Sequence, residues 1–410
     1  MTEFLKLLAP DAARNLILER IMPNLTAEIV DTENAYGLVT AEKITAPHSL
    51  PNFRRSTVDG YAVKAQDTFG ASTSLPAYLK LVGEVLMGQE TELEISPAEC
   101  AKIHTGGMLP VGTSAVVMVE DTQRLNSNEV EIYKPSAVGE NIIEIGEDIK
   151  SGEILISRNK KIREAEIGGL LAFGITKLSV LKKPIVGLLS TGDEIVSPEM
   201  DISPGQVRDI NSHTLSVLIA KYGGIPMRHG IVPDQIDRFM EETEKAFRES
   251  DMLIITAGSS VSARDYTARV INSLGPPGIL VHGINIRPGK PTILAICDGK
   301  PVIGLPGNPV SALVITKLFV HPVLQKLLGL SEPGLNPSIE AELSINIPSR
   351  AGREDWIPVR VLIDSKGLKA EPVFGKSNLI FTLVKSNGLV KIPVDSNGID
   401  AGEIVEVIPL

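Results

Sequence analysis

Three acidic side chains follow apolar, strand-like runs in the middle of the chain, and their chemistry suits a hard cation. They are Glu194, Asp234 and Asp265. Carboxylates of this kind could bind a magnesium ion together with water molecules, as is usual where phosphate groups react. The residues alone also allow a plainer interpretation, in which Asp234 and Asp265 cap or begin helices, because aspartate is a preferred capping residue.

The segment GLPGNPVS (304–311) has the residues of an anion-binding turn. Pro309 fits the first turn of a helix, and Asn308 before it can cap that helix with its side-chain oxygen. Gly304 and Gly307 allow another group to approach the main chain closely. The first-turn N–H groups would then face a bound anion at the positive end of the helix dipole. The alternative is an ordinary capped turn without a ligand.

Strand-like and helical segments alternate between residues 184 and 329, which predicts a mostly parallel sheet covered by helices on both faces. The strand-like runs are 184–190, 225–232, 251–256, 279–286, 292–297 and 301–306, and helical patterns lie between several of them. Ligands of such sheets bind beyond the carboxyl ends of the strands. The loops STGDE, PD, TAGSSVSARD, RPGKP and GLPGNPVS each follow a strand-like run, so we expect them to meet at one edge.

The pattern changes outside this region. Residues 335–410 show short alternating runs separated by Gly, Pro and Asn-Gly, which predicts a small C-terminal β domain. Residues 80–135 are also β-rich, whereas the first 45 residues and residues 163–173 have helical patterns. The 410 residues therefore indicate a multidomain α/β plus β protein.

Composition excludes several classes of protein. The net charge of −10 and the 4% of aromatic residues argue against a nucleic-acid binder, and no apolar stretch reaches the roughly 20 residues of a membrane span. The N-terminal segment lacks the layout of a signal peptide, so a cytoplasmic protein is expected. Two cysteines, Cys100 and Cys297, and six scattered histidines do not suggest a structural zinc site.

Seven motifs occur in the order and at the spacing of one enzyme family. They are STVDGYAV (56–63), HTGGMLPVGTSAVVMVED (104–121), GENIIEIGEDI (139–149), STGDEIV (190–196), GQVRDINS (205–212), RPGKP (287–291) and GLPGNPVS (304–311). With them, nearly the whole chain resembles the molybdopterin molybdenumtransferase family (MoeA and the E domain of gephyrin). This resemblance implies an enzyme that inserts molybdate into adenylylated molybdopterin, with Mg²⁺-dependent release of AMP, in the last step of molybdenum cofactor biosynthesis.

The resemblance also implies four domains. They are a discontinuous N-terminal domain (1–45 and 140–178), a β-rich domain (46–139), a MogA-like molybdopterin-binding α/β domain of three layers (179–329) and a small barrel-like β domain (330–410). The family works as an elongated homodimer in which the partner chain completes each site. The molybdopterin adenylyltransferase is a further partner to consider.

For the reaction itself, the resemblance assigns Glu194, Asp234 and Asp265 to the magnesium ion, which would bridge pyrophosphate oxygens. Asp59 and Asp148 match other active-site carboxylates of the family, and Asp59 would act across the dimer. As turn residues beside glycine, Asp59 and Asp148 could instead be purely structural.

The resemblance further assigns residues that contact the two substrates, molybdate and the adenylylated pterin. Lys290, Ser311, Arg353 and Ser377 match positions that hold molybdate, although Arg353 and Ser377 could instead be surface residues of the C-terminal domain. The implied substrate-binding residues are Thr105, Gly192, Gly258, Ser259, Ser260, Arg287, Lys290, Pro306, Pro309, Ser311, Arg353 and Ser377. We expect His104 and His213, which have no partner pattern, to be structural.

The chain departs from the family at two places. Ile143 and Glu144 follow Ile142 where the family commonly has an arginine, and the loop AGSSVSARDYT contains an additional Arg264. Arg264 could partly supply the lost positive charge. These changes leave the choice between molybdate and tungstate open.

Two other functions remain possible from the sequence. A non-catalytic scaffold that binds a pterin or a peptide would have no need of the carboxylates and of Lys290. A nucleotide-processing enzyme of the competence-damage-inducible type would explain residues 180–329 but neither STVDGYAV nor the C-terminal β domain.

Overall fold

The computed structural model describes residues 7–23, 25–257, 261–331, 337–365 and 367–410, with the backbone alone for residues 261–265. The chain divides into two compact units. The first comprises Met1–Glu42, Arg158–Ile167 and Lys177–Leu410, and the second comprises Lys43–Ser157 and Gly168–Thr176.

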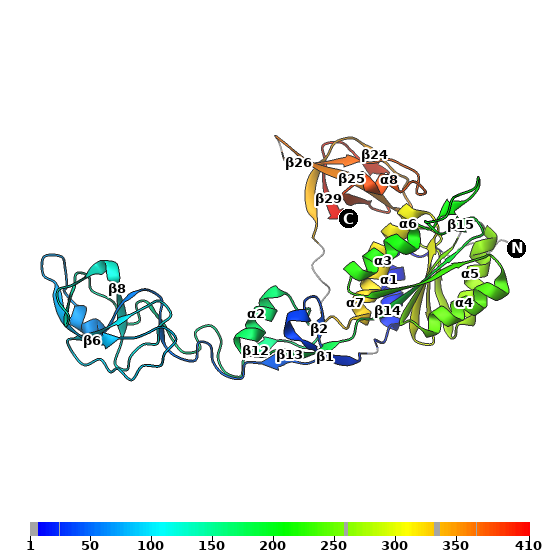
Figure 1. Ribbon diagram of the computed structural model, residues 1–410. Helices are drawn as coiled ribbons and strands as arrows, with labels where there is room; N and C mark the ends of the chain where they lie inside the picture. Colours follow the sequence, from blue (N-terminus) through cyan, green and yellow to red (C-terminus); the bar gives the residue numbers. More distant parts are fainter. Residues whose placement is uncertain (1–6, 24, 258–260, 332–336, 366) are drawn as a thin grey trace. The chain divides into compact units, whose positions relative to one another are not determined.

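A six-stranded sheet forms the centre of the first unit (Figure 1). Its order is β17 (Ile225–Val232), β14 (Ile185–Thr191), β18 (Met252–Ala257), β22 (Lys300–Pro306), β21 (Ile293–Cys297) and β19 (Pro277–His282). The first four strands are parallel, and β21 runs antiparallel to both of its neighbours. The expected mostly parallel sheet is therefore confirmed.

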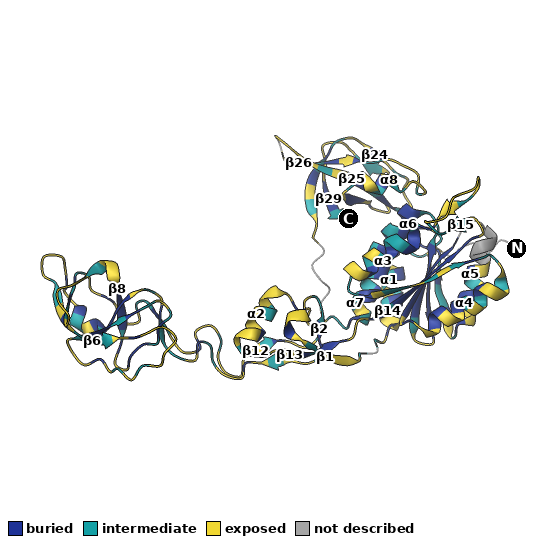
Figure 2. Ribbon diagram, viewed as in Figure 1, coloured by how far each residue is buried: buried dark blue, intermediate teal, exposed yellow. Residues whose placement is uncertain are grey.

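Helices cover both faces of this sheet because its central strands are apolar on both sides. One core joins Leu188 and Ile254 to α1 (Pro10–Arg20), α3 (Asn211–Lys221), α6 (Pro309–Ile315) and α7 (His321–Leu327). The neighbouring residues Leu189 and Ile255 point to the other core, with α4 (Ile236–Arg248) and α5 (Val261–Ser273). Figure 2 shows these strands as a buried layer, so the three-layer arrangement is confirmed.

The helical stretch from Pro309 to Leu327 has the length and apolar character of a membrane span. It comprises α6, the π-helical turn Thr316–Val320 and α7. Phe319 and Leu324 within it are fully buried in the first core, which identifies the stretch as a core helix of the α/β sheet.

The run expected as a single strand at 279–286 is divided in the structure. Strand β19 ends at His282, and Ile286 and Arg287 form a separate short strand, β20, that pairs in parallel with β25 (Glu354–Asp364). The break places the RPGKP loop between the α/β sheet and the C-terminal strands.

The C-terminal strands close into a five-stranded barrel, as expected. Their order is β25, β26 (Gly367–Pro372), β23 (Ile339–Leu343), β29 (Ile404–Pro409) and β27 (Gly388–Ile392), and pairing of β25 with β27 closes the ring. The short elements β24 (Ile347–Pro348), β28 (Gly398–Ile399) and α8 (Phe381–Val384) complete this region.

The N-terminal part of the first unit contains less helix than expected. After α1, the chain forms β1 (Ala27–Asp31), the turn Thr32–Asn34 and β2 (Val39–Thr40), and β13 (Lys177–Leu181) pairs between the two strands. Beyond the central sheet, β15 (Ile195–Val196) and β16 (Val207–Arg208) form a short parallel pair.

The second unit is β-rich, and its main sheet has the order β8 (Ala115–Met118), β5 (Gly60–Val63), β7 (Glu99–Ile103), β6 (Ala77–Glu84), β10 (Glu129–Ile132) and β9 (Thr122–Arg124). Two short pairs accompany it, β4 (Arg55–Ser56) with β11 (Ile142–Ile143) and β3 (Ile44–Thr45) with β12 (Ile154–Ile156). Short 3-10 turns follow β5 and β8 at Ala65–Thr68 and Val119–Asp121. Helix α2 (Glu164–Ala172) continues from the first unit into the second. The finer division into four domains stays a prediction.

Candidate active site

The RPGKP and GLPGNPVS loops and the C-terminal barrel line one cavity of about 730 Å³ in the first unit. Six of the residues predicted to bind substrate lie on its wall, namely Arg287, Lys290, Pro306, Ser311, Arg353 and Ser377. They come from four separate segments of the chain. This cavity is therefore the strongest candidate for a small-molecule site.

The barrel holds the GLPGNPVS turn in place through Ser377. Asn308 Nδ2 donates a hydrogen bond to Ser377 Oγ (3.0 Å), and the Val310 N–H donates to the Ser377 carbonyl (3.0 Å). Helix α6 begins at Pro309, as predicted, with Asn308 at the N-cap position. The predicted cap by the Asn308 side chain is wrong, because that side chain is directed to Ser377 and makes no capping hydrogen bond.

The start of α6 also offers fewer backbone donors than predicted. Pro309 has no N–H, and the N–H of Val310 is already bound to Ser377. An anion in this cavity would instead be bound mainly by side chains. The hydroxyl-bearing Ser311 is buried on the cavity wall, whereas Lys290 is exposed there.

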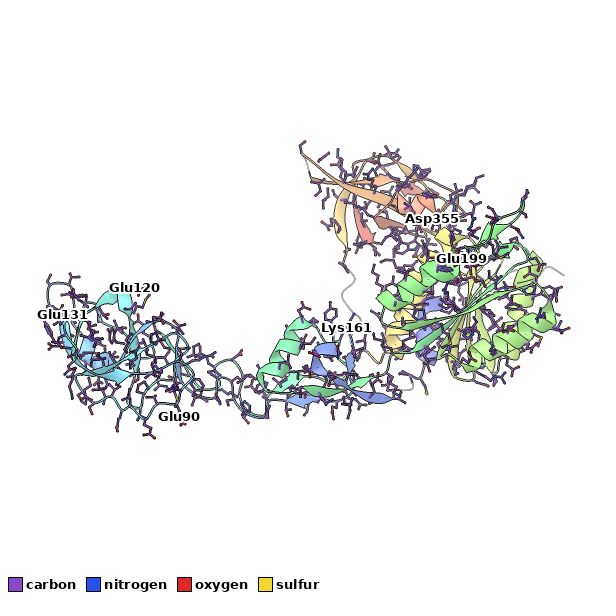
Figure 3. The ribbon with its side chains drawn as sticks, viewed as in Figure 1. Glu90, Glu120, Glu131, Lys161, Glu199 and Asp355 are labelled. Atoms are coloured by element: carbon purple, nitrogen blue, oxygen red, sulfur yellow. The ribbon has the colours of Figure 1, made fainter. Side chains whose placement is uncertain are left out.

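A buried carboxylate, Asp355, organises the cationic side of the cavity. It accepts hydrogen bonds from Arg353 Nε (2.8 Å) and Ser349 Oγ (2.9 Å), and Arg287 Nη1 lies 3.8 Å from its Oδ2. Figure 3 labels Asp355 on the C-terminal barrel. Lys290, in contrast, makes no ion pair with any described residue, so its charge is available to a ligand.

Sequence reasoning missed Asp355. Its side chain is 1% exposed, although it stands in the charged stretch GREDW, which has the composition of a surface segment. The available signal was the alternating run WIPVRVLI directly after Asp355, which predicts a strand and therefore a buried face near this carboxylate.

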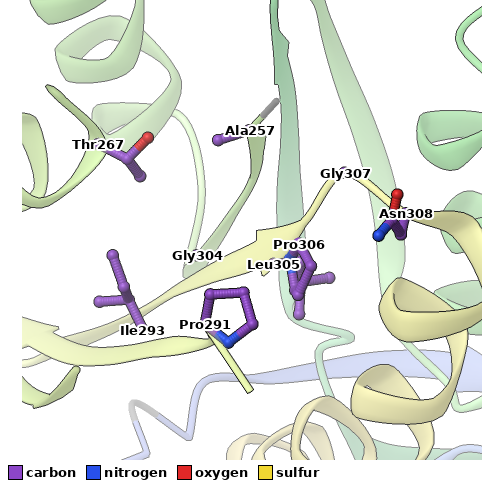
Figure 4. A pocket seen from close by; sticks show the side chains of 9 residues that line it. All are labelled: Ala257, Thr267, Pro291, Ile293, Gly304, Leu305, Pro306, Gly307 and Asn308. Carbon is purple, nitrogen blue, oxygen red and sulfur yellow. The ribbon is translucent and has the colours of Figure 1, made fainter. Parts of the chain in front are cut away.

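A smaller cavity of about 240 Å³ adjoins the first and shares Pro291, Pro306 and Asn308 with it. Ala257, Thr267 and Ile293 line its other parts (Figure 4). Ala257 ends β18 and leads into Gly258, Ser259 and Ser260, which lie outside the described residues. The smaller cavity thus lies at the carboxyl ends of β18 and β22, where ligands of α/β sheets bind.

The predicted carboxylates occupy the same edge of the sheet. Asp234, after β17, accepts a hydrogen bond from the Thr191 hydroxyl at the end of β14 (2.7 Å), and its own N–H donates to Asp193 Oδ1 (3.0 Å). A Cβ on Gly192 would lie 2.8 Å from Glu194 Oε2, so a side chain at this position would require the Glu194 carboxylate to move. Asp265 is the fifth residue of α5, and its side chain is not among those described.

The described side chains alone do not assemble a metal site. No group of three histidine, cysteine, aspartate or glutamate side chains among them is placed to hold an ion. Asp193, Glu194 and Asp234 nevertheless supply oxygen ligands close to the turn after β14, and such ligands fit magnesium.

Asp59 and Thr105 contact each other directly in the second unit. The N–H and hydroxyl of Thr105 both donate to Asp59 Oδ1, at 2.7 and 3.1 Å, and these hydrogen bonds hold the pKa of Asp59 below its usual value. Asp148 belongs to the same unit and is exposed. Asp59 belongs to the second unit and the cavities belong to the first. A contribution of Asp59 to a site that includes these cavities stays a prediction.

His104 has partners that its sequence context does not reveal. Its Nε2 lies 2.9 Å from Glu84 Oε1, which also accepts a hydrogen bond from Lys102 (2.9 Å), and its Nδ1 lies 3.9 Å from Asp59. His213 likewise contacts Arg228 Nη1. His104 therefore lies beside a predicted catalytic carboxylate.

We expect the Thr105→Val variant to raise the pKa of Asp59, because the hydroxyl hydrogen bond stabilises the ionised carboxylate. The pKa should stay below its usual value, since the backbone N–H of Thr105 is the larger cause and remains. An NMR titration of the carboxyl carbon measures this. Thr122→Val, which removes a hydroxyl bound to the Val119 carbonyl, is the control. An unchanged Asp59 pKa in Thr105→Val would contradict the assignment.

The departure at Glu144 changes the charge of the second unit locally. Arg54 Nε donates to both carboxylate oxygens of Glu144, at 3.1 and 3.0 Å, and Ile143 pairs with Arg55 in the short sheet of β4 and β11. Glu144 thus neutralises a nearby arginine.

Comparison with known proteins matches nearly the whole chain to one family. Residues 8–174 match the MoeA N-terminal region (domain I and II), residues 187–326 match a probable molybdopterin binding domain, and residues 340–410 match the MoeA C-terminal region (domain IV).

Individual relatives are similar over their full length. A putative molybdopterin biosynthesis protein of Methanocaldococcus jannaschii is 35% identical over 97% of this chain and 96% of its own. The molybdopterin molybdenumtransferase of Bacillus subtilis is 30% identical over 93% of this chain and 89% of its own. A crystal structure of the molybdopterin biosynthesis MoeA protein of Pyrococcus horikoshii OT3 has a TM-score of 0.86 and 32% identity, covering 99% of this chain and 100% of that one.

Proposed function

The chain belongs to the MoeA family, and from that premise we propose that it is a molybdopterin molybdenumtransferase that inserts molybdate into adenylylated molybdopterin late in molybdenum cofactor biosynthesis. The observation that carries this proposal is the cavity where Lys290, Ser311, Arg353 and Ser377 meet. Those four side chains supply a point charge, a guanidinium fork and two hydroxyls.

Molybdate is a tetrahedral dianion and needs donors on several sides. Asp355 binds Nε and one Nη of Arg353 and so fixes the plane of the guanidinium group. Lys290 contributes a charge that no described carboxylate neutralises, and charge-assisted hydrogen bonds of this kind are the stronger ones. The remaining substrate, adenylylated molybdopterin, would extend into the smaller cavity and along the sheet edge.

The carboxylates after β14, β17 and β18 would hold magnesium. When bound, the ion would offset the negative charge of the substrate's pyrophosphate and favour attack by water on phosphorus, which would break the P–O–P bond and release AMP. The Thr191 hydroxyl orients Asp234, and in this proposal Asp234 would act with Glu194 and Asp265. Three carboxylates at one edge would otherwise repel each other.

The Asp234→Asn variant should need about ten times more magnesium for half-maximal activity, because it replaces an anionic ligand by a neutral one at a cost of about 1.5 kcal/mol. The amide oxygen can still accept the Thr191 hydrogen bond, so the fold is retained. Asp237→Asn, in the exposed first turn of α4, is the control. Equal magnesium curves for both variants would remove Asp234 from the metal site.

We further propose a homodimer whose active site combines the two units of different chains. Asp59, held ionised by Thr105, and Asp148 would come from the second unit of one chain and meet the cavities in the first unit of its partner. The adenylyltransferase that makes the pterin substrate remains a candidate partner.

Reconstitution tests the function directly. Purified protein, adenylylated molybdopterin, magnesium and molybdate should give molybdenum cofactor and AMP, and a parallel reaction with tungstate decides the metal preference. The chain could instead be a non-catalytic pterin-binding scaffold, which would bind adenylylated molybdopterin without releasing AMP. That outcome would refute the proposed reaction.

A further inference from the structure

A third cavity of the first unit, of about 430 Å³, lies apart from the proposed active site. Its lining comes from residues 37–39 and 159–166, the end of α3 and the helix α7. It shares no described lining residue with the cavities around GLPGNPVS. Its volume lies within the roughly 300–1,000 Å³ range of small-molecule sites.

The charge of this cavity is opposite to that of the chain as a whole. Lys160, Lys161, Arg163 and Lys221 line it, although acidic residues outnumber basic ones by 50 to 40 in the full sequence. Its only acidic lining residue is Glu166. Arg163 already binds both oxygens of that carboxylate through Nε, at 3.2 and 2.9 Å.

Two of the lining lysines, Lys161 and Lys221, are therefore not neutralised by an acidic residue of the cavity. The side chains of Lys161 and Lys221 form no hydrogen bond or ion pair with any described residue. Figure 3 labels Lys161. A confined cavity with unpaired positive charges attracts small anions, because its low-dielectric walls concentrate the field.

A stacked pair of rings forms another part of the wall. The rings of Tyr222 and His321 lie 4.0 Å apart at an angle of 21°. Burial, and then Lys317, Lys161 and Lys221, lower the pKa of His321 to about 4, so this ring is neutral at pH 7. The same lysines that depress this pKa are the ones without a carboxylate partner.

A polar atom on the wall also has no partner. Asn159 Oδ1 is buried and accepts no hydrogen bond from any described residue. Buried polar atoms are usually satisfied, so an unpaired oxygen on a residue that lines the cavity is unusual.

We propose that this cavity is a second anion site, which binds the phosphate group of a small molecule through Lys161 and Lys221. The Tyr222–His321 pair would contact any organic part of the ligand, and Asn159 would bind one of its polar groups. This proposal concerns binding alone and does not depend on the reaction of the other site.

Calorimetric titration with inorganic phosphate at low ionic strength tests the site. The titration uses the Lys290→Ala variant as background, so that binding in the proposed molybdate cavity is weakened. Adding Lys161→Ala and Lys221→Ala should then weaken phosphate binding at least tenfold. The control adds Lys182→Ala and Lys183→Ala, which remove the same net charge from exposed positions and should change binding less than twofold.

A second readout uses the protein without substitutions in the cavity. The NMR signals of the His321 ring should shift when phosphate is added, and AMP in place of phosphate shows which source is preferred. If AMP saturates the His321 shift at a concentration ten times lower than phosphate does, the site prefers an organic phosphate. If AMP and phosphate saturate the shift at equal concentrations, free phosphate is sufficient as the ligand. Equal weakening in both lysine pairs, or His321 signals that do not respond to either ligand, would overturn the proposal.

Discussion

The Lys290→Ala variant should need about ten to a hundred times more molybdate for half-maximal insertion than the wild type. Charge-assisted hydrogen bonds contribute roughly 1.5–3 kcal/mol each, and each 1.4 kcal/mol is a factor of ten in affinity. Lys290 lines the 730 Å³ cavity without a carboxylate partner among the described residues, so its charge is not used elsewhere in the protein. Titration with molybdate at saturating adenylylated molybdopterin measures the change.

Two variants distinguish the effect of the positive charge at residue 290 from the effect of the protein's net charge. Lys290→Arg keeps a cation and should recover much of the affinity, whereas Lys183→Ala removes an exposed lysine and should leave the titration unchanged. Binding of adenylylated molybdopterin should change little in Lys290→Ala. If the half-maximal molybdate concentration is the same in Lys290→Ala and wild type, the oxyanion binds elsewhere.

The α/β region was predictable because its determinants are local. An apolar run long enough to cross a sheet predicts a strand, and β17 occupies the residues expected for it, Ile225–Val232. The division of the run 279–286 could not be predicted in the same way. Its last residue, Ile286, begins β20, which pairs with β25 about 70 residues further along the chain, and nothing in the run itself specifies that partner.

In GLPGNPVS, too, one feature follows from local sequence and another depends on a distant residue. The start of α6 at Pro309 follows from proline itself, which is favoured at the first helical position. The orientation of Asn308 depends on Ser377, 69 residues away, so a local capping rule gave the wrong hydrogen bond. Tertiary contacts can override local propensity wherever a competing partner is available.

The resemblance to the family selected candidate site residues that are far apart in the sequence. Six of them line one cavity, although they are spread from Arg287 to Ser377 along the chain. Asp355 was missed because burial of a carboxylate becomes visible only when Arg353, Ser349 and Arg287 surround it. The grouping of Glu194, Asp234 and Asp265 around a metal stays a prediction, as does the role of Asp59.

Mixing two inactive variants should restore activity if each active site is composite. Asp59 belongs to the second unit and Asp265 to the first, and we propose that the two meet across the dimer. Homodimers of Asp59→Ala or of Asp265→Ala would have two defective sites. A heterodimer would concentrate both defects in one site and leave the other intact, since each site takes one unit from each chain.

The amount of activity restored and the matched control follow from the same symmetry. Random exchange makes about half of the dimers heterodimers with one intact site of two, so activity should reach about a quarter of wild type. Mixing Asp59→Ala with Asp148→Ala should restore none, because both residues belong to the second unit and every heterodimer site then carries one defect. Activity is measured after exchange under mild denaturant and compared with each variant exchanged alone. No recovery in the first mixture would mean that Asp59 does not act on the partner's site. Recovery in the second mixture would mean that Asp59 and Asp148 do not act on the same site.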